Sequence, residues 1–599
     1  MSISRGRTIV IAIVALVLIV GVSWNLYTPG RPHIVLITLD TTRADRLGCY
    51  GYAPALTPAL DALAKRGILF ERTYTPVPLT VPAHASLMTG LYPPEHGVRL
   101  NGESRLNESV HTLATVLKKE GYQTGAFVAA FVLQRQFGLD QGFDVYDDDL
   151  STAEPIHDQS HQYRAGEFVV DTALRWLQSQ DDQPFFCWIH LYDPHDPYLA
   201  HPQLFGDEFQ DRAYDAEIAY VDRQVKRVLD QLKARGIDEE TYVIVVGDHG
   251  ESLGEHGERT HGYMTYNATM HVPFIVAGPT IAEPPRRIDS AVSLVDFAPT
   301  IFELLQIEPP HQMAGRSLVP AFEGRALSPQ LYYGESEQAE FAEYGLNIAS
   351  LDCLIAERWK YIRTMKNELY DRKSDPAELK NLAELQPEQT DEMEAQLTRL
   401  NESMIARKAT ALQLPDHDRR VLESLGYVSG TSPTDAVIPR GKLHDIKEVI
   451  TAIYQYRDAA EYMEDGQHDR AIELFSKVIV DVPDYFVAHT NLGTCFARTQ
   501  EYELAAQSFK KALQILPDTK IYIDLAKVHI LQEDFPRAIE ALTSAIEREP
   551  TNAMAHFVLG DAYRFAGEIE KARQEYELVL RLDPGFEQAR YALRTLPKK

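Results

Sequence analysis

Between His33 and about Ser350, short runs of apolar residues alternate with longer segments whose apolar positions recur at helical spacing. Apolar runs of this length are typical of strands that are buried on both faces, and the helical segments between them would connect parallel neighbours. Four such runs occupy residues 33–40, 125–130, 185–193 and 242–248. The pattern predicts an α/β region with a mostly parallel sheet flanked by helices.

Three of these four runs end in an aspartate, namely Asp40, Asp193 and Asp248. The carboxyl ends of parallel strands meet at one edge of a sheet, and open α/β sheets bind their ligands at that edge. We therefore expect the acidic side chains to face one crevice.

A different pattern follows the Gly-, Ser-, Thr- and Pro-rich segment 426–441, which we interpret as a domain boundary. Two residue types recur there at intervals of 34, 33 and 34: alanines at Ala471, Ala505, Ala538 and Ala572, and prolines at Pro483, Pro517, Pro550 and Pro584. An apolar or aromatic residue stands four positions after each alanine. The segment 450–590 thus resembles the tetratricopeptide repeat, an all-α solenoid of stacked helix pairs. Such repeats often bind a protein partner, and a purely stabilising role is the alternative.

The N-terminus contains a candidate membrane segment. Residues 8–24 carry no charge and follow two arginines, which predicts a single-pass signal anchor with residues 1–7 in the cytoplasm. The rest of the chain, beginning with a polar linker at 25–32, would then be extracytoplasmic. The alternative is a cleaved signal peptide with Gly21-Val22-Ser23 as the cleavage site, which would give a secreted or periplasmic protein.

Composition and charge narrow the classes of function. A chain of 599 residues, 45% of them hydrophobic, has enough material for several packed domains. The formal net charge is −28 and no basic patch offsets it, which argues against a nucleic-acid partner. The four cysteines are too scattered for a disulfide framework.

The strand ends also carry a donor set for a metal. Asp40 and Asp248-His249 combine two carboxylates with an imidazole, which suits a divalent cation. A single aspartate at such a place is more often a helix cap, so the prediction depends on the combination.

Thr80 precedes a helix-competent run and is expected to be its N-cap. A hydroxyl at a helix N-terminus is well placed to attack a phosphate or sulfate group.

With these elements in this order, residues 33–383 resemble the sulfatase-like branch of the alkaline phosphatase superfamily. Further segments match landmarks of that branch: Asp193–Tyr198, His261-Gly262, Val272–Val276, Glu368–Asp371, Asp375-Pro376 and Asn381-Leu382. The resemblance implies an alkaline-phosphatase/sulfatase-like fold and an anionic ester substrate.

The resemblance also implies roles for particular residues. The metal would be held by Asp40, Asp248 and His249, with Thr80 as both nucleophile and metal neighbour. We favour zinc or manganese over calcium or magnesium, because an imidazole and a threonine oxygen complete the donor set.

Four further side chains complete the predicted site. His195 and His261 are expected to hold the anionic oxygens of the substrate or to protonate its leaving group, and His84 takes the place of a catalytic arginine. Asn101 is a candidate substrate contact, with a loop-turn role as the alternative.

The nucleophile departs from the sulfatase pattern. Sulfatases oxidise a cysteine or serine to formylglycine, but Thr80 carries a methyl group on Cβ and would give a ketone, so no formylglycine is expected. A threonine can still attack phosphorus and form a phosphothreonine that water hydrolyses. The segment Thr80–His84 also resembles the nucleophile region of nucleotide pyrophosphatases/phosphodiesterases, and phosphoethanolamine transferases use threonine as well.

Other departures concern the metal site. Sulfatases normally have a second aspartate where this chain has Thr41, and the segment 125–128 lacks their lysine. The additional Asp and His pair of the phosphodiesterases is also missing, since Asp193-Pro194-His195 has the wrong spacing. We therefore predict one divalent metal ion and leave a second open.

These observations lead to one hypothesis with three alternatives. We predict a membrane-anchored, metal-dependent hydrolase that cleaves a phosphate ester, preferably a diester, through Thr80. The alternatives are a sulfuric ester hydrolase that uses unmodified Thr80, a transferase of phospho-head groups, and a non-catalytic binding protein that acts through its repeats.

The predicted domain boundaries follow from the same observations. The N-terminus divides into a cytoplasmic segment 1–7, a membrane anchor 8–24 and a linker 25–32. The catalytic domain covers 33–350 and its C-terminal part 351–425, followed by a linker at 426–448 and the repeats at 449–599.

Overall fold

The computed structural model describes residues 31–151, 163–181, 183–281, 285–337, 346–412, 414–424 and 443–597. We call the described residues up to 424 the α/β body and residues 443–597 the repeat region. The predicted membrane segment 8–24 lies outside the described residues. Within the described ranges, no helix has the length and apolar character needed to cross a bilayer.

The α/β body is centred on an eight-stranded sheet with the order β5-β4-β6-β1-β7-β8-β2-β9. Its strands are β1 (His33–Leu39), β2 (Ile68–Tyr74), β4 (Gln123–Phe127), β5 (Val145–Asp147), β6 (Phe185–Leu191), β7 (Thr241–Gly247), β8 (His271–Ala277) and β9 (Arg286–Ser293). All neighbours are parallel except β8, which runs antiparallel to β7 and β2. The predicted mostly parallel sheet is therefore confirmed.

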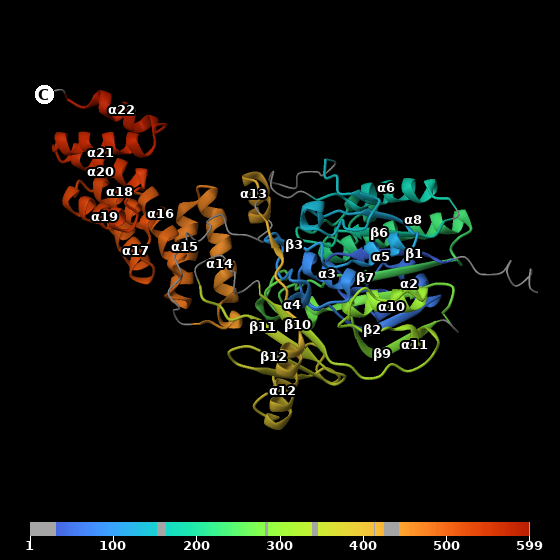
Figure 1. Cartoon of the computed structure of the whole chain (residues 1–599). Coiled ribbons are helices and arrows are strands. Elements are labelled where there is room, and N and C mark those ends of the chain that lie inside the picture. The colour runs from blue at the N-terminus through green and yellow to red at the C-terminus, as the bar shows by residue number, and fades with distance from the viewer. Residues whose placement is uncertain are drawn as a thin grey trace, which may run out of the picture.

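The three central strands β6, β1 and β7 are buried along their whole length, as continuous apolar runs require. Two groups of helices lie against the sheet and complete the layers (Figure 1). One group is α2 (Pro58–Lys65), α6 (Gly166–Ser179) and α8 (Ala213–Arg235), and the other is α3 (Thr80–Thr89), α5 (Leu113–Lys119) and α10 (Phe297–Leu305). The shorter elements are β3 (Ser104–Arg105), α4 (Pro93–His96), α7 (Pro202–Phe205), α9 (Asn267–Met270), α11 (Val319–Phe322), α13 (Asp416–Ser424) and β14 (Thr410–Ala411).

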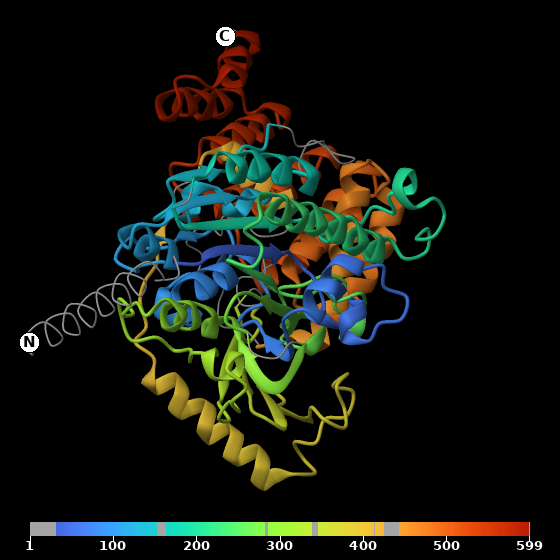
Figure 2. The ribbon, with the colours of Figure 1, turned by 90° about the vertical axis from the view of Figure 1, so that its right-hand side faces the viewer.

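A second, antiparallel sheet follows the first along the chain. It consists of β10 (Tyr332–Ser336), β11 (Leu351–Ile355), β12 (Trp359–Arg363) and β13 (Glu368–Asp371). The amphipathic helix α12 (Pro387–Ser403) packs on it with Met393 and Leu397 buried, and it forms the outer edge of the body in Figure 2. The sequence pattern did not predict this sheet, because its strands are only four or five residues long.

The repeat region is a stack of helices that extends away from the body (Figure 1). It contains α14 (Ile446–Glu464), α15 (His468–Asp481), α16 (Phe486–Arg498), α17 (Tyr502–Ile515), α18 (Thr519–Leu531), α19 (Phe535–Arg548), α20 (Ala553–Phe565), α21 (Ile569–Leu582) and α22 (Glu587–Thr595). The recurring alanines are fully buried between helices, and the helix-pair solenoid is confirmed. The helix nearest to the body is α14.

Candidate active site

The carboxyl ends of β1 and β7 bring two carboxylates together. The two strands are parallel neighbours, and Leu39 pairs with Gly247, so the next residues, Asp40 and Asp248, leave the sheet side by side. Nε2 of His249 lies 3.8 Å from Oδ1 of Asp40 and 3.6 Å from Oδ2 of Asp248. All three side chains are fully buried. The structure therefore gathers the predicted metal-binding residues at one point.

Thr80 faces this group from the first turn of α3. Its Oγ1 lies 3.4 Å from Nε2 of His249. Thr80 is already the first helical residue, and Leu79 occupies the N-cap position without a capping side chain, so the expectation that Thr80 caps the helix was wrong by one residue. The hydroxyl is directed at the imidazole rather than at the amides of its own helix. The nucleophile candidate is thus in contact with the candidate metal ligands.

The donor atoms of this group fit a cation. Across the described residues, neither Oδ1 of Asp40 nor Oδ2 of Asp248 accepts a hydrogen bond. Burial raises the pKa of both acids well above the usual range, and nearby negative charge adds to it, from Glu251 for Asp40 and from Asp40 for Asp248. Nδ1 of His249 donates to the Gly250 carbonyl at 3.0 Å, which directs Nε2 toward the two carboxylates. Asp40, Asp248 and His249 therefore form a site that a divalent cation would complete.

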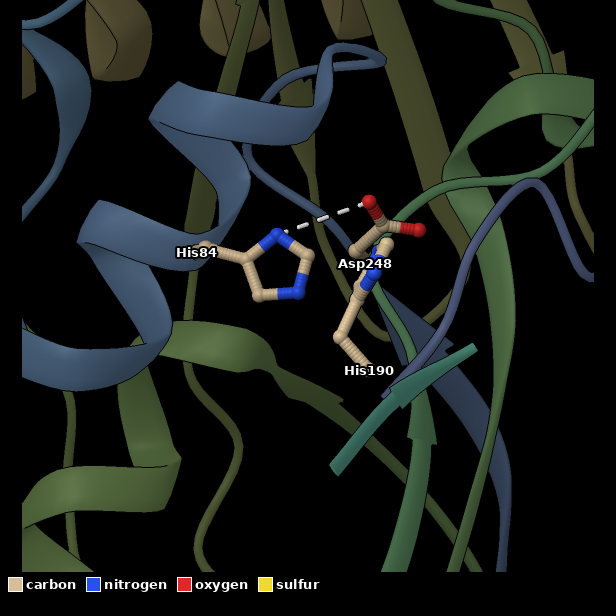
Figure 3. A group of neighbouring side chains, drawn as sticks. All are labelled: His84, His190 and Asp248. Atoms are coloured by element: carbon tan, nitrogen blue, oxygen red, sulfur yellow. Dashed lines mark ion pairs between the residues drawn. The ribbon is translucent and has the colours of Figure 1, made fainter. Parts of the chain in front are cut away.

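A second group, His84, His190 and Asp248, shares one carboxylate with the first (Figure 3). Nδ1 of His84 donates to the Thr80 carbonyl at 2.8 Å, and Nε2 accepts from the Thr38 hydroxyl at 3.0 Å. Nε2 of His190 donates to Oδ2 of Asp40 at 3.1 Å, and its Nδ1 accepts from a backbone amide. Both rings have their nitrogens occupied, so the first group has the better donors for a metal.

His84 therefore has a defined place beneath the nucleophile. The Trp188 indole donates to Thr38 Oγ1 at 3.0 Å, and Thr38 donates onward to His84, which in turn holds the first turn of α3. Burial lowers the pKa of His84 well below its ordinary value, so the ring is neutral. Sequence reasoning missed His190, although it alternates with Trp188 on a buried strand and so shares its face of the sheet.

Asn101 lies at the N-terminus of α3. Its Oδ1 accepts from the Val81 amide at 2.9 Å, while Nδ2 is buried and has no hydrogen-bond partner within the described ranges. A buried amide group with two unused donors is costly unless something accepts from it. The side chain predicted to contact substrate thus has donors to offer beside Thr80.

His195 and His261 form the opposite side of the group. The ring of His261 lies 4.4 Å from that of His249 and 5.0 Å from that of His195. Nδ1 of His261 interacts with Oε1 of Glu251 at 3.1 Å, and Nδ1 of His195 donates to the Asp196 carbonyl at 2.6 Å. Burial lowers the pKa of His261 to about 4. Both histidines therefore lie beside His249, and their roles toward the substrate stay predictions.

Glu251 is a site residue that the sequence analysis did not single out. It is fully buried, and burial together with Asp196 raises its pKa well above the usual range. It stands two residues after His249, so its carboxylate orients His261 from the same strand end. The only sequence signal was its position next to the Asp248-His249-Gly250 motif.

Family models match both the α/β body and the repeat region. A family model described as Sulfatase matches residues 32–307, and one described as the C-terminal part of N-sulphoglucosamine sulphohydrolase matches residues 254–406. A tetratricopeptide repeat model matches residues 456–518 and 523–585.

Individual relatives are distant but cover most of their own length. A Δ4,5-hexuronate-2-O-sulfatase from Bacteroides thetaiotaomicron is 26% identical over 59% of this chain and 85% of its own. The choline-sulfatase of Rhizobium meliloti is 28% identical over 60% of this chain and 83% of its own. The crystal structure of the phosphonate monoester hydrolase of Agrobacterium radiobacter has a TM-score of 0.52, is 24% identical, and covers 63% of this chain and 96% of its own.

Proposed function

This chain carries a sulfatase domain of the alkaline phosphatase superfamily followed by tetratricopeptide repeats, and we propose that it hydrolyses a phosphate ester, preferably a diester, with Thr80 as nucleophile. The domain makes the protein a hydrolase of ester bonds. The observation that supports the proposal is the position of the Thr80 hydroxyl, 3.4 Å from His249, next to which Asp40 and Asp248 each have one oxygen without a hydrogen-bond partner among the described residues.

The reaction that we propose has two steps. Oγ1 of Thr80 forms a bond to phosphorus while the bond from phosphorus to the leaving oxygen breaks, and the threonine proton is passed to that oxygen. Water then attacks the phosphothreonine, releasing phosphate or a phosphate monoester and restoring the hydroxyl. The hydrogen bond from His84 to the Thr80 carbonyl keeps the first turn of α3 in place during both steps.

A divalent cation, zinc or manganese in our proposal, would be held by Asp40, Asp248, His249 and Thr80. Such a cation neutralises the carboxylates, lowers the pKa of a nearby hydroxyl and stabilises charge on the transferred group. A second cation stays open, although the occupied nitrogens of His84 and His190 do not favour one.

In our proposal the remaining side chains of the site transfer protons and contact the substrate. With a pKa of about 4, His261 enters the reaction as a neutral imidazole and accepts the proton that it later returns to the leaving oxygen. In the tautomer that we assign, Nδ1 of that ring donates to Glu251, so the unprotonated Nε2 is the atom that accepts the proton. We assign Asn101 Nδ2 and His195 to the substrate's anionic oxygens.

Sulfate ester hydrolysis is the second candidate, because the relatives reported above include sulfatases. Thr80 argues against sulfate ester hydrolysis, because a threonine cannot supply the formylglycine on which sulfatases depend. Transfer of a phospho-head group would also use a threonine, and the predicted anchor at 8–24 suits a membrane-bound acceptor. We further propose an extracytoplasmic location for the body and a protein partner for the repeats.

The test compares the full chain with Thr80→Ala and Thr80→Ser on matched aryl sulfate, phosphate monoester and phosphate diester substrates. We expect phosphate ester cleavage that falls about 10³-fold or more in Thr80→Ala and survives in part in Thr80→Ser, because serine retains the attacking oxygen. Phosphothreonine at position 80, detected by mass spectrometry after rapid quenching, would identify the intermediate.

Other results would overturn the proposal. Sulfate cleavage that depends on Thr80 would establish the second candidate. Full activity in Thr80→Ala would exclude this residue as nucleophile, and recovery of the phosphoryl group on an added acceptor alcohol, instead of on water, would establish transfer.

A further inference from the structure

The first helix of the repeat region, α14, packs against the loop that carries His261. This loop, residues 254–264, lies between β7 and β8 and returns from the metal-binding motif to the sheet. Helix α14 packs on the short helical turn Glu255–Gly257 within it. Two regions that look separate in sequence therefore meet beside the candidate active site.

Apolar contacts form the first part of this junction. Tyr263 in the loop and Ile450, Ile453 and Tyr454 on α14 belong to one cluster of buried residues. Gly257 packs so close that a Cβ added there would lie 3.4 Å from Ile450. The C-terminal end of the loop is thus packed into a core that it shares with α14, while Gly254, Gly257 and Arg259 stay exposed.

Charged groups form the second part. Arg259 in the loop makes two hydrogen bonds to the Asp458 carboxylate, at 2.8 and 3.0 Å, and its guanidinium lies 5.0 Å from the centre of the Tyr454 ring. A bidentate arginine–carboxylate pair fixes orientation as well as distance. The pair is partly exposed, so it adds orientation to a placement that the apolar cluster holds.

The loop is also closed on its inner side, next to the catalytic histidine. Glu258 is buried, and its Oε1 accepts from the amides of Tyr263 at 2.8 Å and Met264 at 3.3 Å, so the loop folds back around His261. On α14, Arg457 stands three positions after Tyr454 and so shares its face of the helix. After burial, its positive charge contributes to the lowered pKa of His261.

We propose that α14 is a positioning element of the active site: it holds the loop 254–264 through Arg259, Asp458 and Tyr454 and thereby places His261 against His249. The rate of ester cleavage then depends on the docking of the first repeat. This inference rests on the function proposed above, because it assigns His261 a part in that reaction.

Charge reversal across the junction tests the proposal in the full chain. Arg259→Asp and Asp458→Arg each replace an attractive pair with a repulsive one, and the double variant restores the attraction with the signs exchanged. We expect each single variant to lower kcat about three- to tenfold with little change in KM or bound metal, and the double variant to recover most of the loss. Asp524→Arg on α18 is the matched control, since Asp524 pairs with Lys527 on the surface of the same helix, away from the junction, and it should leave kcat unchanged.

Hydrogen exchange of the loop 254–264 supplies a readout that needs no substrate. Faster exchange in both single variants and recovery in the double variant would support positioning even if the wild type cleaved none of the three esters, a result that would count against the proposed function alone. Unchanged loop exchange, or unchanged kcat in an active enzyme, would overturn the inference. Should a single variant fail to fold, Asp458→Asn removes the charge without repulsion and is judged by the same two measurements.

Discussion

The α/β body and the repeat region bury different kinds of side chain. The body places Asp40, Asp248 and His249 in its interior at the ends of two strands, where the carboxylates repel each other. The repeats bury alanines and aromatic rings, and their buried histidines are satisfied: His489 and His556 each bond the carbonyl of the proline six residues earlier. The contrast separates a histidine whose ring serves packing from His249, which faces two carboxylate oxygens that have no hydrogen-bond partner in the described structure.

The largest expected effect comes from removing a carboxylate of the predicted metal site. Asp248→Asn should lower ester cleavage about 10³-fold, since a catalytic metal contributes several kcal/mol. In chelator, the same variant should be more stable than the wild type by about 1 kcal/mol, because the repulsion with Asp40 disappears. Metal analysis and thermal unfolding measure both effects, and a variant that keeps its metal would show that the ligand set is wrong.

A buried acid away from the metal site should give the body a marked pH dependence. Burial raises the pKa of Glu258 from its ordinary 4.5 to about 8. A raised pKa means that the folded state binds the proton more tightly than the unfolded state, so this contribution to stability is complete below pH 4.5 and is lost as the pH rises through 8. At about 1.4 kcal/mol for each unit of pKa, the loss amounts to a few kcal/mol.

Glu258→Gln keeps the oxygen that accepts the two amides and removes the titration. Urea unfolding between pH 5 and pH 9, values that span about this window, should show a flatter profile for Glu258→Gln than for the wild type. Glu255→Gln is the control for an acid whose pKa is shifted in the opposite direction. Arg43 beside Glu255 lowers the pKa of that carboxyl despite its partial burial. Parallel profiles for wild type and Glu258→Gln would contradict the assignment.

A packing defect in the repeats should change stability and leave chemistry alone. A Cβ added at Gly560 would lie 2.5 Å from the fully buried Tyr576 ring, so Gly560→Ala should cost about 1–3 kcal/mol. At Gly585 the nearest atom is Oδ1 of the Asp583 side chain, at 3.2 Å, and Gly585→Ala serves as the control. Denaturant unfolding measures the change in stability, and kcat measures the effect on chemistry. A loss of activity in Gly560→Ala would show that distant repeats also act on the site.

The smallest effect belongs to a surface pair in the repeats. Lys527 and Asp524 lie 2.9 Å apart at i,i+3 spacing, and the lysine side chain is half exposed. Lys527→Ala should change the free energy of unfolding by less than about 0.5 kcal/mol, because water and salt screen such pairs. A change above about 1 kcal/mol, measured by denaturant unfolding, would mean that the stack depends on its surface charges.

The sequence pattern predicted the helical repeats and the strands that consist of long apolar runs. The strands β1, β6 and β7 were found as continuous apolar runs, and the solenoid was found from its alanine and proline register. The antiparallel direction of β8 was not found, because an apolar run does not reveal its direction. The run at 125–130 was placed a few residues late, since β4 ends at Phe127.

The candidate site was predictable where chemistry and position coincide. Asp40, Asp248 and His249 stand at strand ends, and strand order then brings them together. Glu251 and His190 were missed because their importance appears only through a contact made in three dimensions, with His261 and Asp40 respectively. The placement of Thr80 inside the first helical turn, rather than before it, depends on backbone geometry that composition does not record.

The cluster shared by α14 and the body sets the smallest fragment that can be prepared in soluble form. A chain cut in segment 425–442, where the composition changes, would uncover Tyr263 and Leu351 on one fragment and Ile446 and Ile453 on the other. Freshly exposed apolar surface of this kind promotes aggregation. Expression of the catalytic part therefore requires at least the first repeat, and unfolding of the body and of α14 should occur in one cooperative transition.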